Sequence, residues 1–205
     1  MEPDAPPDRA RSRRQLIAGG AAVAAGAGAA AVIASCGGSP KTQSATTIST
    51  VQQQSDAAIL NALLDLEHSA IVAYGVAARR LRGAALAEAR RFLGQERQHA
   101  AALVRMIHRV AGTPEPPRSA AEYESAFPPI RSATDALGFA FDVETTAVSA
   151  YADAIPKLAS PGARTLTAAI LTTESEHMAV VLGELGRPQV PEPFVTGPPP
   201  QPEST

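Results

Sequence analysis

Residues 93–101 read LGQERQHAA, and residues 171–179 read LTTESEHMA. Both stretches contain the pattern Leu-x-x-Glu-x-x-His-x-Ala, which matches Glu96 and His99 with Glu174 and His177. Each residue of a helix advances by about 100°, so a Glu and a His three positions apart lie about 60° from each other on one face. If it is helical, each stretch therefore presents a carboxylate and an imidazole side by side.

A second pair of repeated stretches precedes the first. Residues 65–74 read DLEHSAIVAY and residues 142–151 read DVETTAVSAY, which aligns Glu67 with Glu144 and Tyr74 with Tyr151. The separation along the chain is the same for this pair and for the Glu-x-x-His pair to within a single position. The chain is therefore internally duplicated. Its four carboxylates and two imidazoles are the set that a two-metal site in a four-helix bundle requires.

The apolar pattern predicts four long helices, at about residues 56–81, 84–110, 133–158 and 162–185. Ser55 or Asp56 is expected to cap the first of them. Residues 112–131 contain five prolines and separate the second helix from the third. A connection of this length suits a crossover along the whole bundle, which makes those two helices parallel. The predicted fold is all-α: a four-helix bundle over residues 55–186 with a long crossover and a pseudo-twofold internal repeat.

Composition supports a helical fold and excludes some functions. Aromatic residues make up 4% of the 205 residues and Trp is absent, which disfavours a β-sandwich. The net charge of −2 gives no basic surface for nucleic acid. The single cysteine, Cys36, excludes an intramolecular disulfide.

The four glutamates lie on the apolar stripes of their predicted helices. An ionised Glu in a core is costly unless it is paired, and no Lys or Arg lies on these stripes. Two divalent cations would balance the four carboxylates, and two neutral imidazoles would complete their coordination. The predicted metal ligands are Glu67, Glu96, His99, Glu144, Glu174 and His177. A bundle without metal, in which the same residues form hydrogen bonds, is the alternative.

Two tyrosines lie on the same stripes, Tyr74 in the first half and Tyr151 in the second. A Tyr at such a position is either part of the packing or a hydrogen-bond donor, because a buried hydroxyl needs a partner. A carboxylate that binds a metal would be a suitable acceptor.

The N-terminal residues have the pattern of an export signal. Arg13 and Arg14 precede an Ala/Gly-rich apolar run and resemble a twin-arginine signal, although Leu16 stands where Phe is more usual. Residues 33–36 read IASC and resemble a bacterial lipobox, in which Cys36 is lipidated and becomes the mature N-terminus. The alternative is an uncleaved membrane helix over residues 16–35.

These patterns divide the rest of the chain. We expect a signal peptide over residues 1–35, a flexible tether over 36–54 and a Pro-rich extended tail over 187–205. The protein is then exported and lipid-anchored, on the outer face of the cytoplasmic membrane or in the cell envelope.

With these residues in place, the chain resembles the ferritin-like superfamily of di-iron and di-manganese carboxylate proteins over about residues 55–185. More narrowly, it resembles the bacterial ferritin-like domain family grouped with desiccation-related proteins. The resemblance implies that Glu67 and Glu144 are terminal ligands, one for each ion, and that His99 and His177 complete one site each. It also implies that the remaining two ligands, Glu96 and Glu174, bridge the ions.

The resemblance further implies redox chemistry of iron or manganese with dioxygen or peroxide, such as Fe(II) oxidation or peroxide removal that protects the envelope. The residues do not choose between the two metals, and turnover stays an open question. The alternative functions are a non-catalytic lipoprotein that binds a partner and a protein that sequesters, delivers or senses metal. A homodimer is compatible with this sequence.

Overall fold

The computed structural model describes residues 48–194. Arg13, Arg14 and Cys36 lie outside the described residues, as do most of the expected tether and the end of the Pro-rich tail. Every regular element of the described part is helical, which confirms the predicted all-α fold. The elements are α1 (Thr50–Ala77), α2 (Gly83–Arg109), α3 (Ala120–Glu124), α4 (Ala133–Ala154), the 3₁₀ helix η2 (Ile155–Lys157) and α5 (Pro161–Glu184).

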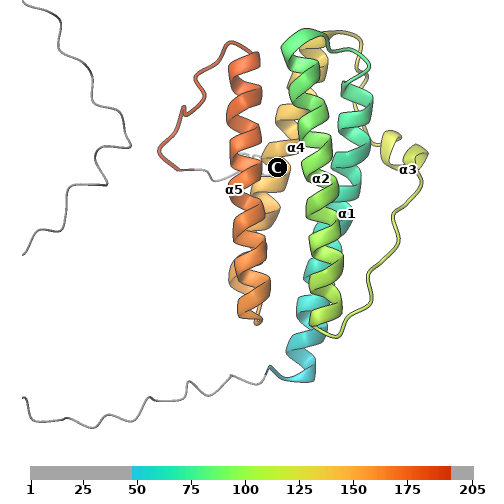
Figure 1. The fold of residues 1–205 in the computed structure, drawn as a ribbon, viewed down its shortest axis with the longest axis vertical. Coiled ribbons are helices and arrows are strands. Elements are labelled where there is room, and N and C mark those ends of the chain that lie inside the picture. The colour runs from blue at the N-terminus through green and yellow to red at the C-terminus, as the bar shows by residue number, and fades with distance from the viewer. Residues whose placement is uncertain (1–47, 195–205) are drawn as a thin grey trace, which may run out of the picture. The chain divides into compact units, whose positions relative to one another are not determined.

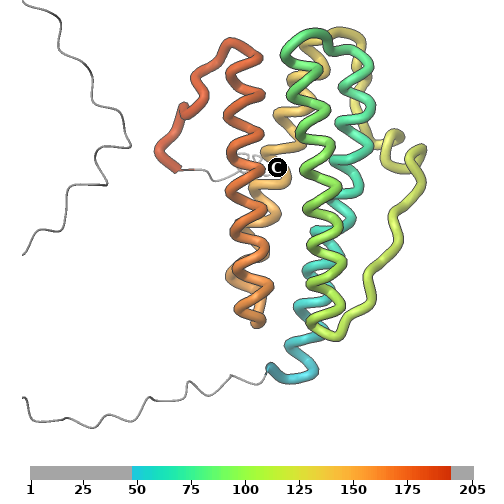
Figure 2. Tube along the Cα trace, in the orientation of Figure 1, coloured from blue at the N-terminus to red at the C-terminus, as the bar shows by residue number. Residues whose placement is uncertain are grey.

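The four long helices form a bundle of two antiparallel pairs, α1 with α2 and α4 with α5 (Figure 1). The connection between α2 and α4 runs along the outside of the bundle and includes the short helix α3 (Figure 2). Because this connection returns the chain to the end from which α2 started, α2 and α4 run in the same direction. The expected crossover is therefore confirmed.

The first helix begins earlier than predicted. Ser49, not Ser55 or Asp56, is its cap, and its side chain forms a capping box with Gln52. Asp56 is fully buried inside α1, where its carboxylate accepts the backbone N–H groups of Ala159 and Ser160 at 2.8 and 2.7 Å. The prediction of a cap at residue 56 was wrong because this Asp stabilises the distant turn before α5. The tether is also shorter than the expected residues 36–54, because residues 50–54 belong to α1.

The remaining bounds differ less from the prediction. The third predicted helix is α4, which ends at Ala154 and continues as η2 through Pro156. Proline has no N–H to donate and its ring clashes with the preceding turn, so the α-helical pattern stops there. Ser132 caps α4 in a capping box with Asp135, and Pro161 is the first residue of α5.

The core consists of two apolar clusters. The first cluster fills the end of the bundle where α1 begins and α2 ends, here called the first end, and it includes Leu60, Leu63, Leu103, Met106 and Ile170. The second cluster fills the opposite, second end, and it includes Tyr74, Ala89, Phe92, Ala140 and Val181. The predicted metal ligands lie in sequence and in space between the two clusters.

Polar contacts attach the crossover to α1. Asn61 hydrogen bonds with two backbone groups of the crossover, at 3.0 and 2.9 Å. Asp65 accepts from the Arg118 guanidinium at 3.1 and 2.7 Å and from the Tyr123 hydroxyl at 2.6 Å. By length and composition α1 alone among the described helices could cross a membrane, but its buried polar residues bind other parts of the bundle, so its apolar character reflects a central place in the core.

Candidate metal centre

The structure brings the six predicted ligands together in one layer across the bundle, which we call the polar layer. It consists of Glu67 from α1, Glu96 and His99 from α2, Glu144 from α4, and Glu174 and His177 from α5. These residues form two overlapping groups, in each of which one ligand atom per residue lies within 4.8 Å of all the others. One group contains Glu67 and His99, the other contains Glu144 and His177, and both contain Glu96 and Glu174.

Each imidazole directs its Nδ1 atom toward three carboxylates. The Nδ1 atom of His99 lies 2.8 Å from Glu174, 3.4 Å from Glu96 and 3.6 Å from Glu67. The Nδ1 atom of His177 lies 3.2 Å from Glu96, 3.3 Å from Glu174 and 3.5 Å from Glu144. The two shared glutamates thus face both imidazoles, whereas the other two glutamates each face one.

The ligand atoms of the polar layer are buried without hydrogen bonds. The four glutamates are at most 1% exposed and His177 is 2% exposed. One oxygen of each glutamate and the Nδ1 atom of each histidine have no hydrogen-bond partner among residues 48–194. A buried polar atom without a partner is destabilising. Oxygen and imidazole nitrogen ligands suit iron and manganese, so the donor set fits two such ions.

Burial and neighbouring charges divide the four carboxyl groups into two kinds. Burial raises the pKa of Glu67 to about 8 and the pKa of Glu144 well above its ordinary value. Burial opposes the ionisation of Glu174 too, but the two imidazoles outweigh it and lower its pKa to about 2. The pKa of Glu96 is lowered by the same two imidazoles against the effect of burial.

The pKa values of the two imidazoles are raised, which complements the lowered pKa values of Glu96 and Glu174. Burial alone would lower their pKa values, but the surrounding carboxylates raise the pKa of His99 to about 12 and that of His177 to about 11. Without metal at neutral pH, two imidazolium cations therefore face two carboxylates, and the other two carboxyl groups hold protons. In this protonation state the net charge of the metal-free polar layer is zero.

Each tyrosine donates a hydrogen bond to one of the two glutamates that each belong to a single ligand group, Glu67 and Glu144, which we call the outer glutamates. Tyr74 on α1 donates its hydroxyl hydrogen to Oε1 of Glu144, and Tyr151 on α4 donates to Oε1 of Glu67. Burial raises the pKa of both phenols well above the ordinary value, so they stay protonated donors. Each glutamate is thus left with Oε2 free to face the centre.

Two contacts of His177 were not predicted from the sequence. Its Nε2 atom donates to the side-chain oxygen of Gln95 at 2.9 Å, which leaves Nδ1 available to bind a metal ion. Its ring stacks on Phe92 with ring centroids 4.0 Å apart. Phe92 precedes Glu96 by one turn and lies on the same apolar stripe, so the helical spacing could have predicted its place beside the polar layer. Gln95 follows no such spacing, because adjacent helix residues point about 100° apart.

Comparisons with known proteins agree with this fold. The profile described as Ferritin-like domain matches residues 55–187. A conserved hypothetical protein from Mycobacterium tuberculosis superposes with a TM-score of 0.58 at 18% identity, covering 64% of this chain and 97% of that one. A dodecameric thioferritin, the bacterioferritin-related protein from Bacteroides fragilis, superposes with a TM-score of 0.57 at 22% identity, covering 65% of this chain and 86% of that one.

No protein of curated function matches the chain in sequence, and the two solved structures support the fold alone. The family profile, however, covers well over half of the chain and includes every residue of the polar layer. This protein therefore belongs to the ferritin-like domain family.

Proposed function

We propose that this protein binds two divalent metal ions, iron or manganese, in the polar layer. The observation that carries the proposal is the convergence of four buried carboxylates and two imidazoles, whose ligand atoms form two groups with all members within 4.8 Å of one another. In this proposal Glu67 and His99 hold one ion, and Glu144 and His177 hold the other. Glu96 and Glu174, which occur in both groups, bridge the two.

The charges support this assignment. Four carboxylates balance two dications, and both imidazoles then act as neutral ligands. The tyrosine hydroxyls orient the outer glutamates, because each occupies one carboxylate oxygen and leaves the other free. The apolar clusters on both sides exclude water from the layer.

We further propose redox chemistry with dioxygen or peroxide. When bound, two Fe(II) or Mn(II) ions supply the two electrons that, with two protons, reduce dioxygen to hydrogen peroxide or hydrogen peroxide to two water molecules. The protein's part is to keep the ions adjacent, to hold the carboxylate orientation through the tyrosines, and to keep solvent out.

The N-terminal sequence supports a cellular location for this function. The twin-arginine pattern at Arg13 and Arg14 and the lipobox ending at Cys36 support export and a lipid anchor in the cell envelope. There the protein would protect against metal or peroxide stress, as a member of the subgroup grouped with desiccation-related proteins. We also propose association of the bundle, at least as a homodimer, which mass photometry would test.

Metal analysis tests the proposal most directly. Protein purified from its own host should contain about two iron or manganese ions per chain, and the Glu96→Ala variant should retain far fewer, since it loses a ligand of both ions. The matched control is Glu176→Ala, which changes an exposed glutamate on α5. Substantially fewer than two ions in the unaltered protein would reject the dinuclear centre. Stopped-flow oxidation of bound Fe(II) then separates a redox enzyme from a protein that only sequesters metal.

A further inference from the structure

The internal duplication allows the two ends of the bundle to be compared position by position. The alignment of the Glu/Tyr stretches matches Leu63 at the first end with Ala140 at the second. The alignment of the Glu-x-x-His stretches matches Leu103 with Val181, and it matches Met106 with Glu184. At each of these positions the second end has a smaller or a charged side chain where the first end has a large apolar one.

The packing of the two ends differs accordingly. At the first end, Leu63, Leu103 and Met106 are all buried in the first cluster. At the second end, Ala140 and Val181 are buried as well, but Glu184 is exposed and leaves the place of a buried Met open. A Leu in place of Ala adds three carbon atoms, and protein interiors are packed closely enough for such a loss of volume to leave space.

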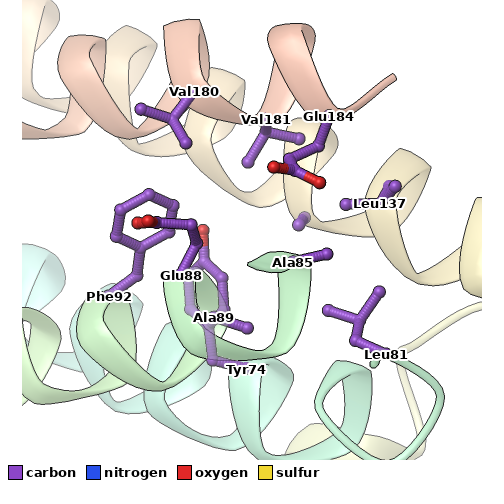
Figure 3. A pocket seen from close by; sticks show the side chains of 11 residues that line it. Tyr74, Leu81, Ala85, Glu88, Ala89, Phe92, Leu137, Val180, Val181 and Glu184 are labelled. Atoms are coloured by element: carbon purple, nitrogen blue, oxygen red, sulfur yellow. The ribbon is translucent and has the colours of Figure 1, made fainter. Parts of the chain in front are cut away.

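A cavity lies at the second end, between α2 and α5 (Figure 3). Its lining is mostly apolar and includes two carboxylates, Glu88 and Glu184. Its volume is about 10 Å³, roughly what a single water-sized molecule occupies. The lining residues are Tyr74, Leu81, Ala85, Glu88, Ala89, Phe92, Leu137, Ala140, Val180, Val181 and Glu184.

Two residues that line the cavity contact one half of the polar layer. Tyr74 and Phe92 line the cavity. Tyr74 donates its hydroxyl to Glu144, and Phe92 stacks on His177. Both residues therefore connect the cavity with the Glu144 and His177 half, and neither contacts the Glu67 and His99 half in this way.

We propose that this cavity binds dioxygen and delivers it to the Glu144 and His177 half of the centre. Dioxygen is small, neutral and apolar, so it enters an apolar space that a hydrated cation or hydrogen peroxide could occupy only by losing hydrogen bonds to water. Glu88, which lines the cavity, is already paired with Arg91, so it is not a free cation ligand. The inference rests on the proposed redox function and deepens it, since it names the oxidant and the half of the centre that receives it.

The first experiment detects dioxygen in the cavity without any redox reaction. The protein is loaded with Zn(II), which is diamagnetic and redox-inert, and methyl NMR relaxation is measured under nitrogen and under several bar of dioxygen. Paramagnetic dioxygen should enhance the relaxation of the Val181 and Leu137 methyl groups several-fold more than that of their first-end counterparts Leu103 and Leu60. Equal enhancement at the two ends would overturn the proposal, whatever the metal does in solution.

The second experiment fills the cavity. Ala140→Leu and the milder Val181→Leu restore the residues of the first end, and each should abolish the excess relaxation at the second end. With Fe(II) bound, each should lower the second-order rate constant for oxidation by dioxygen at least about fivefold, because access to the centre is blocked. The number of bound Fe(II) ions should be unchanged, which excludes misfolding. An unchanged rate constant in a variant that has lost the excess relaxation would overturn the delivery role. If the unaltered protein does not bind Fe(II) at all, the proposed function is rejected, but the dioxygen site is not.

Discussion

Metal loading should release protons in a number that the polar layer dictates. Without metal at pH 7, Glu67 holds a proton because burial raises its pKa to about 8, and Glu144 holds one because burial raises its pKa well above the ordinary value. The imidazoles of His99 and His177 each carry an extra proton, since their pKa values are about 12 and 11. The other two carboxylates are ionised.

Metal ligands must be deprotonated, so binding removes all of these protons. Two ions should release about four protons per chain at pH 7, or about two for each ion. The layer stays neutral in both states, because two imidazolium cations facing two carboxylates give way to two dications facing four carboxylates. The affinity for each ion should therefore rise about 100-fold per pH unit near neutrality. The rise should become less steep above about pH 8, where Glu67 is already ionised without metal.

Isothermal titration calorimetry with Zn(II) measures this release. Titrations at pH 7 in two buffers with different ionisation enthalpies give the number of protons from the difference in observed heat. Glu144→Gln should lower the number by at least one, because its amide carries no ionisable proton and one ion also loses a ligand, and Glu176→Gln, at an exposed position, should leave it unchanged. A release of one proton or fewer per ion in the unaltered protein would refute the assigned protonation states.

Five further substitutions, one of them a control, test individual contacts and backbone positions. Tyr74→Phe removes a hydrogen bond to a ligand carboxylate and should weaken the binding of one ion about tenfold in a chelator competition, and unchanged binding of both ions would deny the tyrosine this role. Ala111 has a φ of 60°, so Ala111→Gly should raise the free energy of unfolding in urea by up to about 1 kcal/mol. Gly112→Ala should lower it by about 1–3 kcal/mol, because a Cβ there would lie 2.5 Å from a neighbouring Cβ, and the backbone argument fails if the two variants shift in the same direction. Asp56→Ala leaves two backbone N–H groups without an acceptor and should cost about 2–4 kcal/mol by the same measurement. The exposed Asp153→Ala should change stability by less than about 0.5 kcal/mol, and similar losses for both would contradict the buried role of Asp56.

The duplicated pattern made the bundle and the grouping of the ligands predictable. Glu67, Glu96 and His99 lie on apolar stripes at helical spacing, and the same holds for their counterparts, so a bundle with inward stripes has to bring them together. The Pro-rich crossover was predictable too, because the duplication requires two parallel helices that a short turn cannot join.

Contacts between distant elements could not be predicted from local sequence patterns. Asp56 has the chemistry of a helix cap, and only the position of the turn before α5 shows that it accepts N–H groups there instead. Gln95 reaches His177 from a helix face that periodicity does not single out. The carboxylate that each tyrosine binds depends on the register between α1 and α4, which the spacing within either helix leaves undetermined.

The polar layer and the apolar clusters constrain the two halves of the chain differently. Glu96 and Glu174 belong to both groups of the polar layer, so in the proposed dinuclear centre a change in either half would disturb both ions, and the layer would have to keep its symmetry. Apolar packing has no such requirement, because a core tolerates changes in side-chain size while enough area stays buried. The first cluster contains 14 buried residues and the second contains eight, so the first end contributes more of the hydrophobic stability. The second end can therefore lose side-chain volume without unfolding the bundle. It is also the end at which a cavity is lined by Tyr74 and Phe92, which contact Glu144 and His177 of the polar layer.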